Sequence, residues 1–184
     1  MRGCEDKTAG ASACAAYLEE CTLTYHKELE YYGGDILRSP GMQLEKQLIQ
    51  HGDVTVYDHS VFVAERCVAL AKRWPGPVDM RKLVRGALLH DYFLYDWHED
   101  DDSHRLHGFT HAGRALRNAK RDFAISEIEE DMIGCHMFPL NVSCFPKTTE
   151  GRILCLVDKM CATYETARGI KAAVKRRVFG CGTD

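Results

Sequence analysis

The chain has 184 residues, of which 45% are hydrophobic and 28% charged, with a formal net charge of -3. This length and composition predict one domain with a substantial core, and the slightly acidic balance argues against a nucleic-acid partner, because nucleic-acid-binding domains are usually basic. No apolar stretch approaches the ~20 residues of a membrane span and no signal-peptide pattern is present, so we expect a cytoplasmic protein without a membrane partner.

Helical periodicity recurs along most of the chain, whereas the sustained alternation of a strand is absent. The first helix is expected to end at Gly33-Gly34, and Asp79 is a suitable N-cap for the fourth. Ser126 and Glu129 match a capping box at the start of the sixth. The predicted helices cover residues 13–32, 41–50, 58–74, 79–91, 110–119, 126–136 and 149–166.

The sequence contains nine cysteines and no C-x-x-C pair. Several of them, such as Cys67 and Cys155, stand at apolar positions of predicted helices. We interpret them as buried free thiols in a reducing compartment, because a disulfide scaffold is unusual at this size and a thiolate metal site lacks its spacing.

Six candidate metal ligands lie within these helices or at their ends. The pair His90-Asp91 ends an apolar run, where both side chains can reach one metal ion and the second carboxylate oxygen can reach another. Asp158 stands among apolar neighbours, and a buried carboxylate needs a partner or a metal. Taken singly, each of these residues is more often a cap, a surface group or an ion-pair partner. Together the set predicts a site for one or two divalent ions (Fe, Mn, Zn, Ni or Mg), formed by His59, His90, Asp91, His111, His136 and Asp158.

The ordered motif resembles the HD-domain superfamily of metal-dependent phosphohydrolases. The matching stretches are Tyr57-Asp58-His59-Ser60-Val61, Ala87-Leu88-Leu89-His90-Asp91 and Leu156-Val157-Asp158-Lys159, while His111 and His136 look like the additional pair of the binuclear subgroups. The match covers roughly residues 45 to 167. The resemblance implies that His59, His90, Asp91 and Asp158 hold a first metal, and that Asp91 bridges to a second metal, which His111 and His136 complete.

The expected fold is therefore an all-α, single-domain, HD-domain-like helical bundle of about seven or eight helices. Residues 39–170 would form the HD-like metal-binding domain. Residues 1–38 would be an N-terminal helical extension of unknown role, and residues 171–184 a short basic C-terminal tail. The sequence does not indicate the oligomeric state.

The segment after His90-Asp91 departs from the pattern of several relatives. The Gly and Lys that follow the pair in many binuclear members are absent, which argues against a cyclic dinucleotide phosphodiesterase. Leu94 stands where the single-metal nucleotidases carry a Glu. An aromatic cluster occupies this segment instead, and it would either pack against the bundle or contact a base or sugar of the substrate; its members are Tyr92, Phe93, Tyr95 and Trp97.

The residues expected to act in catalysis are Asp91, Lys159 and His107. Lys159 is the favoured cation for a substrate phosphate, with Arg105 and Arg114 as alternatives, although each of the three is by default a surface residue. His51, in the loop before the first ligand, is a candidate lid contact or an ordinary loop residue, and His104 is expected to face solvent.

We therefore expect a metal-dependent phosphohydrolase that acts on a small phosphate ester, with a nucleotide as the expected substrate, through attack of a metal-activated water on phosphorus. Two alternatives stay open at this point. The same ligand set resembles that of the di-iron oxygenases of this fold, and a metal-stabilised domain without catalytic activity could sense a nucleotide or a partner protein.

Overall fold

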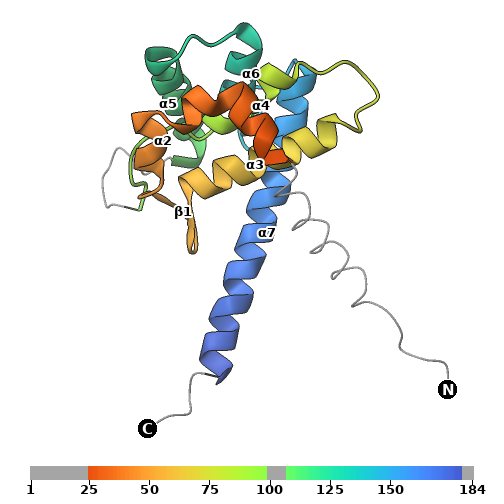
Figure 1. The fold of residues 1–184 in the computed structure, drawn as a ribbon. Helices are drawn as coiled ribbons and strands as arrows, with labels where there is room; N and C mark the ends of the chain where they lie inside the picture. Colours follow the sequence, from red (N-terminus) through yellow and green to blue (C-terminus); the bar gives the residue numbers. More distant parts are fainter. Residues whose placement is uncertain (1–24, 99–106, 180–184) are drawn as a thin grey trace, which may run out of the picture.

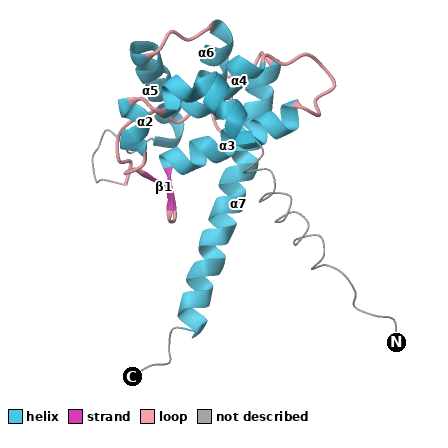
Figure 2. Cartoon of the chain, viewed as in Figure 1, coloured by secondary structure: helices cyan, strands magenta, loops and turns pink. Residues whose placement is uncertain are grey.

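The computed structural model describes residues 25–98 and 107–179, without the side chains of His51, His107 and residues 171–179. Within this part the chain forms seven helical segments and one short hairpin, which confirms the predicted all-α, single-domain fold (Figures 1 and 2). The elements are a helix over residues 25–37, α2 (Pro40–Glu45), β1 (Ile49–His51), β2 (Val54–Thr55), α3 (Val56–Ala71), α4 (Met80–Leu89), α5 (His107–Asp122), α6 (Glu127–Cys135) and α7 (Thr149–Phe179). None of the described helices has the length and apolarity needed to cross a membrane.

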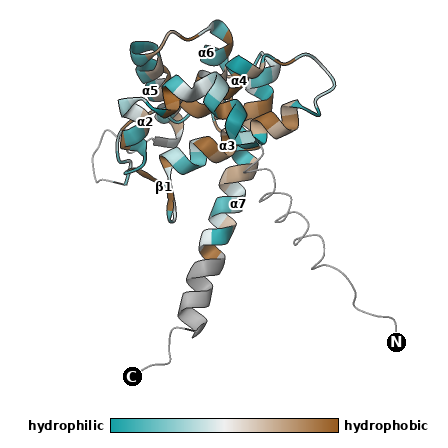
Figure 3. Ribbon diagram, viewed as in Figure 1, coloured by the Kyte–Doolittle hydropathy of each residue, from teal (hydrophilic) through white to brown (hydrophobic). Residues whose placement is uncertain are grey.

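Helix α4 lies at the centre of the bundle. Every residue from Leu83 to Leu89 is buried, and the helix packs against α3, α5, α6 and α7. Hydrophobic segments of α3 and α4 meet in the interior (Figure 3). Because α4 is enclosed along its length, the two residues that follow it, His90 and Asp91, also lie inside the protein.

A buried arginine joins three helices. The Arg85 guanidinium donates through Nη1 to both carboxylate oxygens of Asp35, at 2.9 and 2.8 Å, and through Nε to Glu129 at 3.0 Å. A buried guanidinium requires such partners, since an unpaired charge in the interior is strongly destabilising. The ion pairs therefore hold helix 25–37 and α6 next to α4.

The predicted end of the first helix at Gly33-Gly34 is wrong, because the helix continues to residue 37. A Cβ atom added to Gly33 would lie 2.5 Å from Leu88 Cδ1 and 3.3 Å from Val84 Cγ1. The missing side chain thus allows this helix to approach α4 closely, so Gly33 serves helix packing rather than helix termination.

The predicted helix over residues 41–50 is also wrong in its second half. Helix α2 ends at Glu45, and residues 49–55 form an antiparallel hairpin in which Ile49 pairs with Thr55. Gly52 has a φ of 60° at the turn, a conformation that glycine adopts readily. The hairpin points Gln50 toward the bundle interior, where its side chain is buried.

The predicted starts of α4 and α6 agree with the structure, and a side chain caps each of these helices. Asp79 accepts a hydrogen bond from the Lys82 N–H at 3.1 Å, and Ser126 and Glu129 form the expected capping box. The last helix, in contrast, is longer than expected. It runs to Phe179, and the part that follows the bundle projects away from it (Figure 1).

Two cysteines form a disulfide bond, between Cys135 and Cys144. The expectation of free thiols is wrong for this pair and correct for Cys67, Cys155 and Cys161, which are free and buried. The disulfide fastens the loop after α6 to the last residue of that helix.

Burial of Glu65 on α3 predicts a pH-dependent stability. Burial raises the pKa of this carboxyl from 4.5 to about 7 in the folded protein, while the Arg66 charge opposes the shift. Between these two pH values the unfolded chain has lost the proton and the folded chain retains it, so stability falls as pH rises and then levels off above about 7. Glu65→Gln should remove the contribution of Glu65 to this fall and stabilise the protein at pH 8 by about 2 kcal/mol relative to wild type. Denaturant unfolding between pH 4.5 and pH 8 measures the free energy of unfolding of both proteins. If this free energy depended on pH in the same way in wild type and variant, the prediction would be contradicted.

Candidate metal centre

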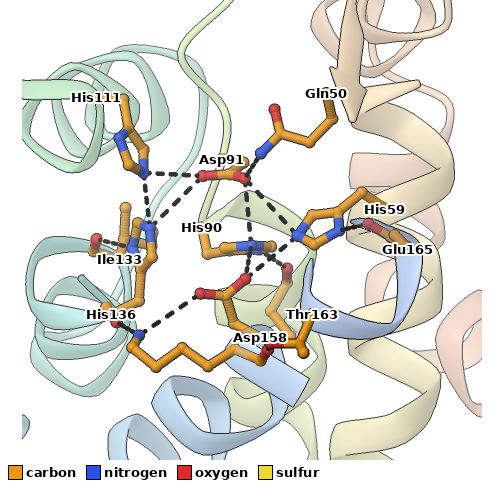
Figure 4. A network of polar contacts seen from close by, with 12 residues as sticks. Gln50, His59, His90, Asp91, His111, Ile133, His136, Asp158, Thr163 and Glu165 are labelled. Atoms are coloured by element: carbon orange, nitrogen blue, oxygen red, sulfur yellow. Dashed lines mark hydrogen bonds and ion pairs between the residues drawn. The ribbon is translucent and has the colours of Figure 1, made fainter. Parts of the chain in front are cut away.

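Six buried histidine and aspartate side chains meet in the interior of the bundle (Figure 4). They form two groups, and within each group one ligand atom per residue lies within 4.8 Å of the others. The first group comes from α3, the end of α4 and α7. The second comes from the end of α4, from α5 and from the end of α6. The first group consists of His59, His90 and Asp158, and the second of Asp91, His111 and His136.

Two of the histidines are oriented by hydrogen bonds to backbone carbonyl groups at the ends of helices. His90 is the C-cap of α4 and His136 is the C-cap of α6. In each ring Nδ1 lies 2.8 Å from the backbone carbonyl oxygen three residues earlier, that of Ala87 or Ile133. With Nδ1 donating to these carbonyls, Nε2 is left with a free lone pair that faces the centre.

The Asp91 carboxylate lies between the two groups. Its Oδ1 is 3.3 Å from His111 Nε2 and 3.5 Å from His136 Nε2. Its Oδ2 is 3.5 Å from His90 Nε2 and 3.9 Å from His59 Nε2. One carboxylate thus offers a separate oxygen to each group, which is the arrangement required of a bridging ligand.

Both carboxylates at the centre are ionised. Burial alone would raise the pKa of Asp91, but the facing imidazoles of His90, His111 and His136 hold it well below its usual range. Burial would also raise the pKa of Asp158. The hydrogen bonds from His59 and His90 outweigh burial and hold this pKa well below its usual range.

The histidines differ in their electrostatic surroundings. Burial lowers the pKa of His59, but its hydrogen bonds to Asp158 and Glu165 outweigh burial and raise the pKa to about 10. For His136 burial prevails, and the pKa is lowered. Negative charge is therefore concentrated around His59, on the side of the first group.

The donors fit a divalent metal. His90 Nε2 and Asp91 Oδ1 are buried and have no hydrogen-bond partner among the described residues. The Nε2 atoms of His111 and His136 face each other at 3.0 Å. A cation would accept the lone pairs of these imidazoles and neutralise the carboxylates, and imidazole with carboxylate oxygen is a ligand set that suits Zn, Fe, Mn or Ni.

Two residues that the sequence analysis missed contact the ligands directly. Gln50 Nε2 donates to Asp91 Oδ2 at 2.5 Å, and Glu165 Oε2 accepts from His59 Nδ1 at 2.8 Å. Glu165 follows Asp158 by two helical turns and so shares its face of α7, a signal that periodicity alone could have supplied. Gln50 gave no such signal, because the hairpin that positions it was not predicted, and the sequence indicated the neighbouring His51 instead.

A third unpredicted residue, Glu45, is fully buried beside the centre. Neither of its carboxylate oxygens has a hydrogen-bond partner among the described residues. Burial raises its pKa well above the usual range, and the negative charge of Asp91 adds to this effect. Glu45 therefore retains its proton to a higher pH than the carboxyl groups of Asp91 and Asp158 do.

Of the residues expected to act with the ligands, Lys159 lies at the centre. Its Nζ donates to the His136 carbonyl oxygen at 2.6 Å and is 3.7 Å from Asp158 Oδ2, while 37% of its side chain is exposed. Arg114 instead lies over the Tyr95 ring, at 4.7 Å from the centroid. His107 is the first residue of α5, but its side chain lies outside the described part, as do residues Arg105 and His104.

The aromatic cluster after His90-Asp91 mainly packs against the bundle. Tyr92 and Phe93 are almost completely buried, and the Phe93 ring contacts those of Tyr95 and His111 with centroids 5.0 and 6.1 Å apart. The cluster surrounds a turn at Leu94, whose φ of 60° is uncommon for a residue other than glycine. Tyr95 and Trp97 stay half-buried.

Comparison with models of known protein families gives a match. The family model described as HD domain matches residues 56–163, more than half of the chain, and this range includes all six residues of the two groups. Neither the curated proteins nor the solved structures contain a match to the chain.

Removal of the shared carboxylate should empty both groups together. We expect the wild-type protein to bind two equivalents of a divalent metal. Asp91→Ala should lose most of both, because Asp91 provides one carboxylate oxygen to each group of histidines. Elemental analysis after purification without chelators measures the stoichiometry. Asp122→Ala is the control, since this carboxylate accepts from the Tyr92 hydroxyl rather than facing the histidines. Two equivalents retained in Asp91→Ala would disprove a bridging role.

Proposed function

The chain belongs to the HD domain family, whose members are generally metal-dependent phosphohydrolases, and from this we propose that it hydrolyses a small phosphate ester, most simply a nucleotide. The observation that carries the proposal is the position of Asp91, with one carboxylate oxygen toward each ligand group. Two cations held by one carboxylate are close enough to bind the same phosphoryl group.

The six ligands would divide between two metal ions. His59, His90 and Asp158 would hold one ion, His111 and His136 the other, and Asp91 would bind both. Bound in this way, the ions would supply Lewis acidity toward the phosphoryl oxygens and activate a water molecule for attack on phosphorus. The helix-capping bonds of His90 and His136 keep these rings oriented before substrate binds, which reduces reorganisation during the reaction.

Lys159 would bind the substrate phosphate. Its ammonium group donates to the His136 carbonyl and lies 3.7 Å from Asp158 Oδ2, and it would donate a further hydrogen bond to a phosphate oxygen. Its partly exposed position between the two groups allows this contact. A nucleotide base could stack on the half-buried ring of Tyr95, which packs on Phe93 beside His111. His107 stays a candidate for contact with the substrate.

A di-iron oxygenase is the main alternative, because four imidazoles and two carboxylates suit iron as well as they suit Mn or Zn. A non-catalytic metal-stabilised domain is the other. The cytoplasmic location and the lack of nucleic-acid and membrane partners stay predictions from the sequence. Disulfide bonds such as Cys135–Cys144 are less common in proteins of reducing compartments.

The proposed function is tested by loading the protein separately with Mn, Fe(II), Zn, Ni or Mg and assaying phosphate mono- and diesters together with nucleotides. We expect phosphate or alcohol release that requires metal and disappears in Asp91→Ala. Dioxygen consumption by the Fe(II) form without ester hydrolysis would favour the oxygenase. Metal binding without turnover in either assay would favour the non-catalytic domain.

Substitution of Lys159 should weaken catalysis while leaving the metals in place. For Lys159→Met we expect kcat/KM to fall by about 10- to 100-fold, the value of one charged hydrogen bond to a phosphate oxygen. Lys82→Met is the matched control, because 37% of its side chain is also exposed but it pairs with Asp79 at the far end of α4. Equal activities of the two variants on every hydrolysed ester would rule out the role of Lys159.

A further inference from the structure

Three of the four candidate ligand histidines, His59, His90 and His136, differ in the kind of partner that their Nδ1 atoms contact. His90 and His136 each donate from Nδ1 to a neutral backbone carbonyl oxygen, at 2.8 Å in both cases. His59 donates from Nδ1 to the carboxylate of Glu165, also at 2.8 Å. The distances are the same, so the difference lies in the charge of the acceptor.

Glu165 and Asp158 hold the His59 ring from its two sides (Figure 4). Asp158 Oδ1 is 3.3 Å from Nε2, and Glu165 Oε2 is 2.8 Å from Nδ1. Both carboxylates come from α7, seven residues apart, which places them two turns from each other on one face. The Glu165 side chain is only 6% exposed, so water has little access to replace it.

A carboxylate behind a metal-binding imidazole has a known physical effect. It fixes the tautomer that leaves Nε2 free, holds the ring in place and makes the imidazole a stronger electron donor. A backbone carbonyl supplies the first two effects, but much less of the third, because hydrogen bonds to charged acceptors are stronger.

The acidic side chains around the centre are also unevenly distributed between the two groups. The first group contains Asp158, is supported by Glu165 and shares Asp91 through Oδ2. The second group contains no carboxylate besides Asp91, and its histidines His111 and His136 lie beside Oδ1 of that residue. A divalent cation in the first group therefore meets more negative charge than one in the second.

We propose that Glu165 is a positioning residue that makes the metal position of His59, His90 and Asp158 the tighter of the two. The inference rests on the proposed two-metal centre. In the folded protein the first equivalent of metal occupies this position, and the second equivalent fills the position of His111 and His136 at higher metal concentration.

The test is a Mn²⁺ titration of the metal-free protein, with free Mn²⁺ followed by its electron paramagnetic resonance signal. Wild type should bind one tight and one weaker equivalent, separated by at least about tenfold in Kd. Glu165→Gln keeps the size and a hydrogen-bond acceptor but removes the charge. It should weaken the tight equivalent by about 10- to 100-fold and leave the weaker one nearly unchanged.

Glu150→Gln is the matched control. Glu150 lies on the same helix, is as buried as Glu165, and accepts from the Asp79 N–H at 2.7 Å, remote from the centre. This variant should titrate like wild type. If both variants weakened metal binding equally, Glu165 would act only through the stability of α7 and the proposal would be wrong.

Variants of the ligands test independently of Glu165 which of the two groups binds the tight equivalent. His111→Ala should retain the tight equivalent and Asp158→Ala the weak one. Two equal equivalents in wild type, or the reverse outcome in these variants, would overturn the inference while leaving a two-metal centre intact. Absence of Mn²⁺ binding by wild type would instead contradict the proposed function itself.

Discussion

One buried carboxylate, that of Asp91, is the contact on which both ligand groups depend. Charge in a protein interior is costly unless charged or hydrogen-bonding partners surround it. Here the partners are four imidazoles and the Gln50 amide, which the fold gathers around the end of α4. The apolar burial of α4 brings Asp91 into the interior, and the polar groups of the neighbouring helices compensate for that burial. The hydrophobic core and the centre are therefore parts of one packing arrangement.

The sequence predicted those parts of the fold that depend on local contacts. The capping box of Ser126 and Glu129 is an interaction within one helical turn, so its residue types identify it directly. The six ligand candidates were recognisable because each stands on or beside a helix with a clear apolar face. Gly33 was misinterpreted, since a glycine can end a helix or admit a neighbouring one, and only its packing on Leu88 distinguishes the two roles.

Contacts between distant segments were beyond the reach of the sequence. Glu165 lies 106 residues from His59, and Gln50 lies 41 residues from Asp91. Periodicity places Glu165 on the same face of α7 as Asp158, but it does not reveal which side chain that face meets. The hairpin that carries Gln50 is too short to produce a pattern of alternation. The supporting residues of the centre were thus hidden, whereas the six residues of the two groups are the ones that the sequence predicted as ligands.

The two ligand groups also differ in how far along the chain their members are spread. The second group is drawn from α4, α5 and α6, which follow one another, whereas His59 and Asp158 of the first group are 99 residues apart. Short loops close with a smaller loss of entropy, so contacts between consecutive elements tend to form earlier in folding. A chain that folds in the presence of a cation would therefore complete the Asp91, His111 and His136 group first, before α7 docks. The order in which the two positions assemble during folding would then be opposite to their order of affinity at equilibrium.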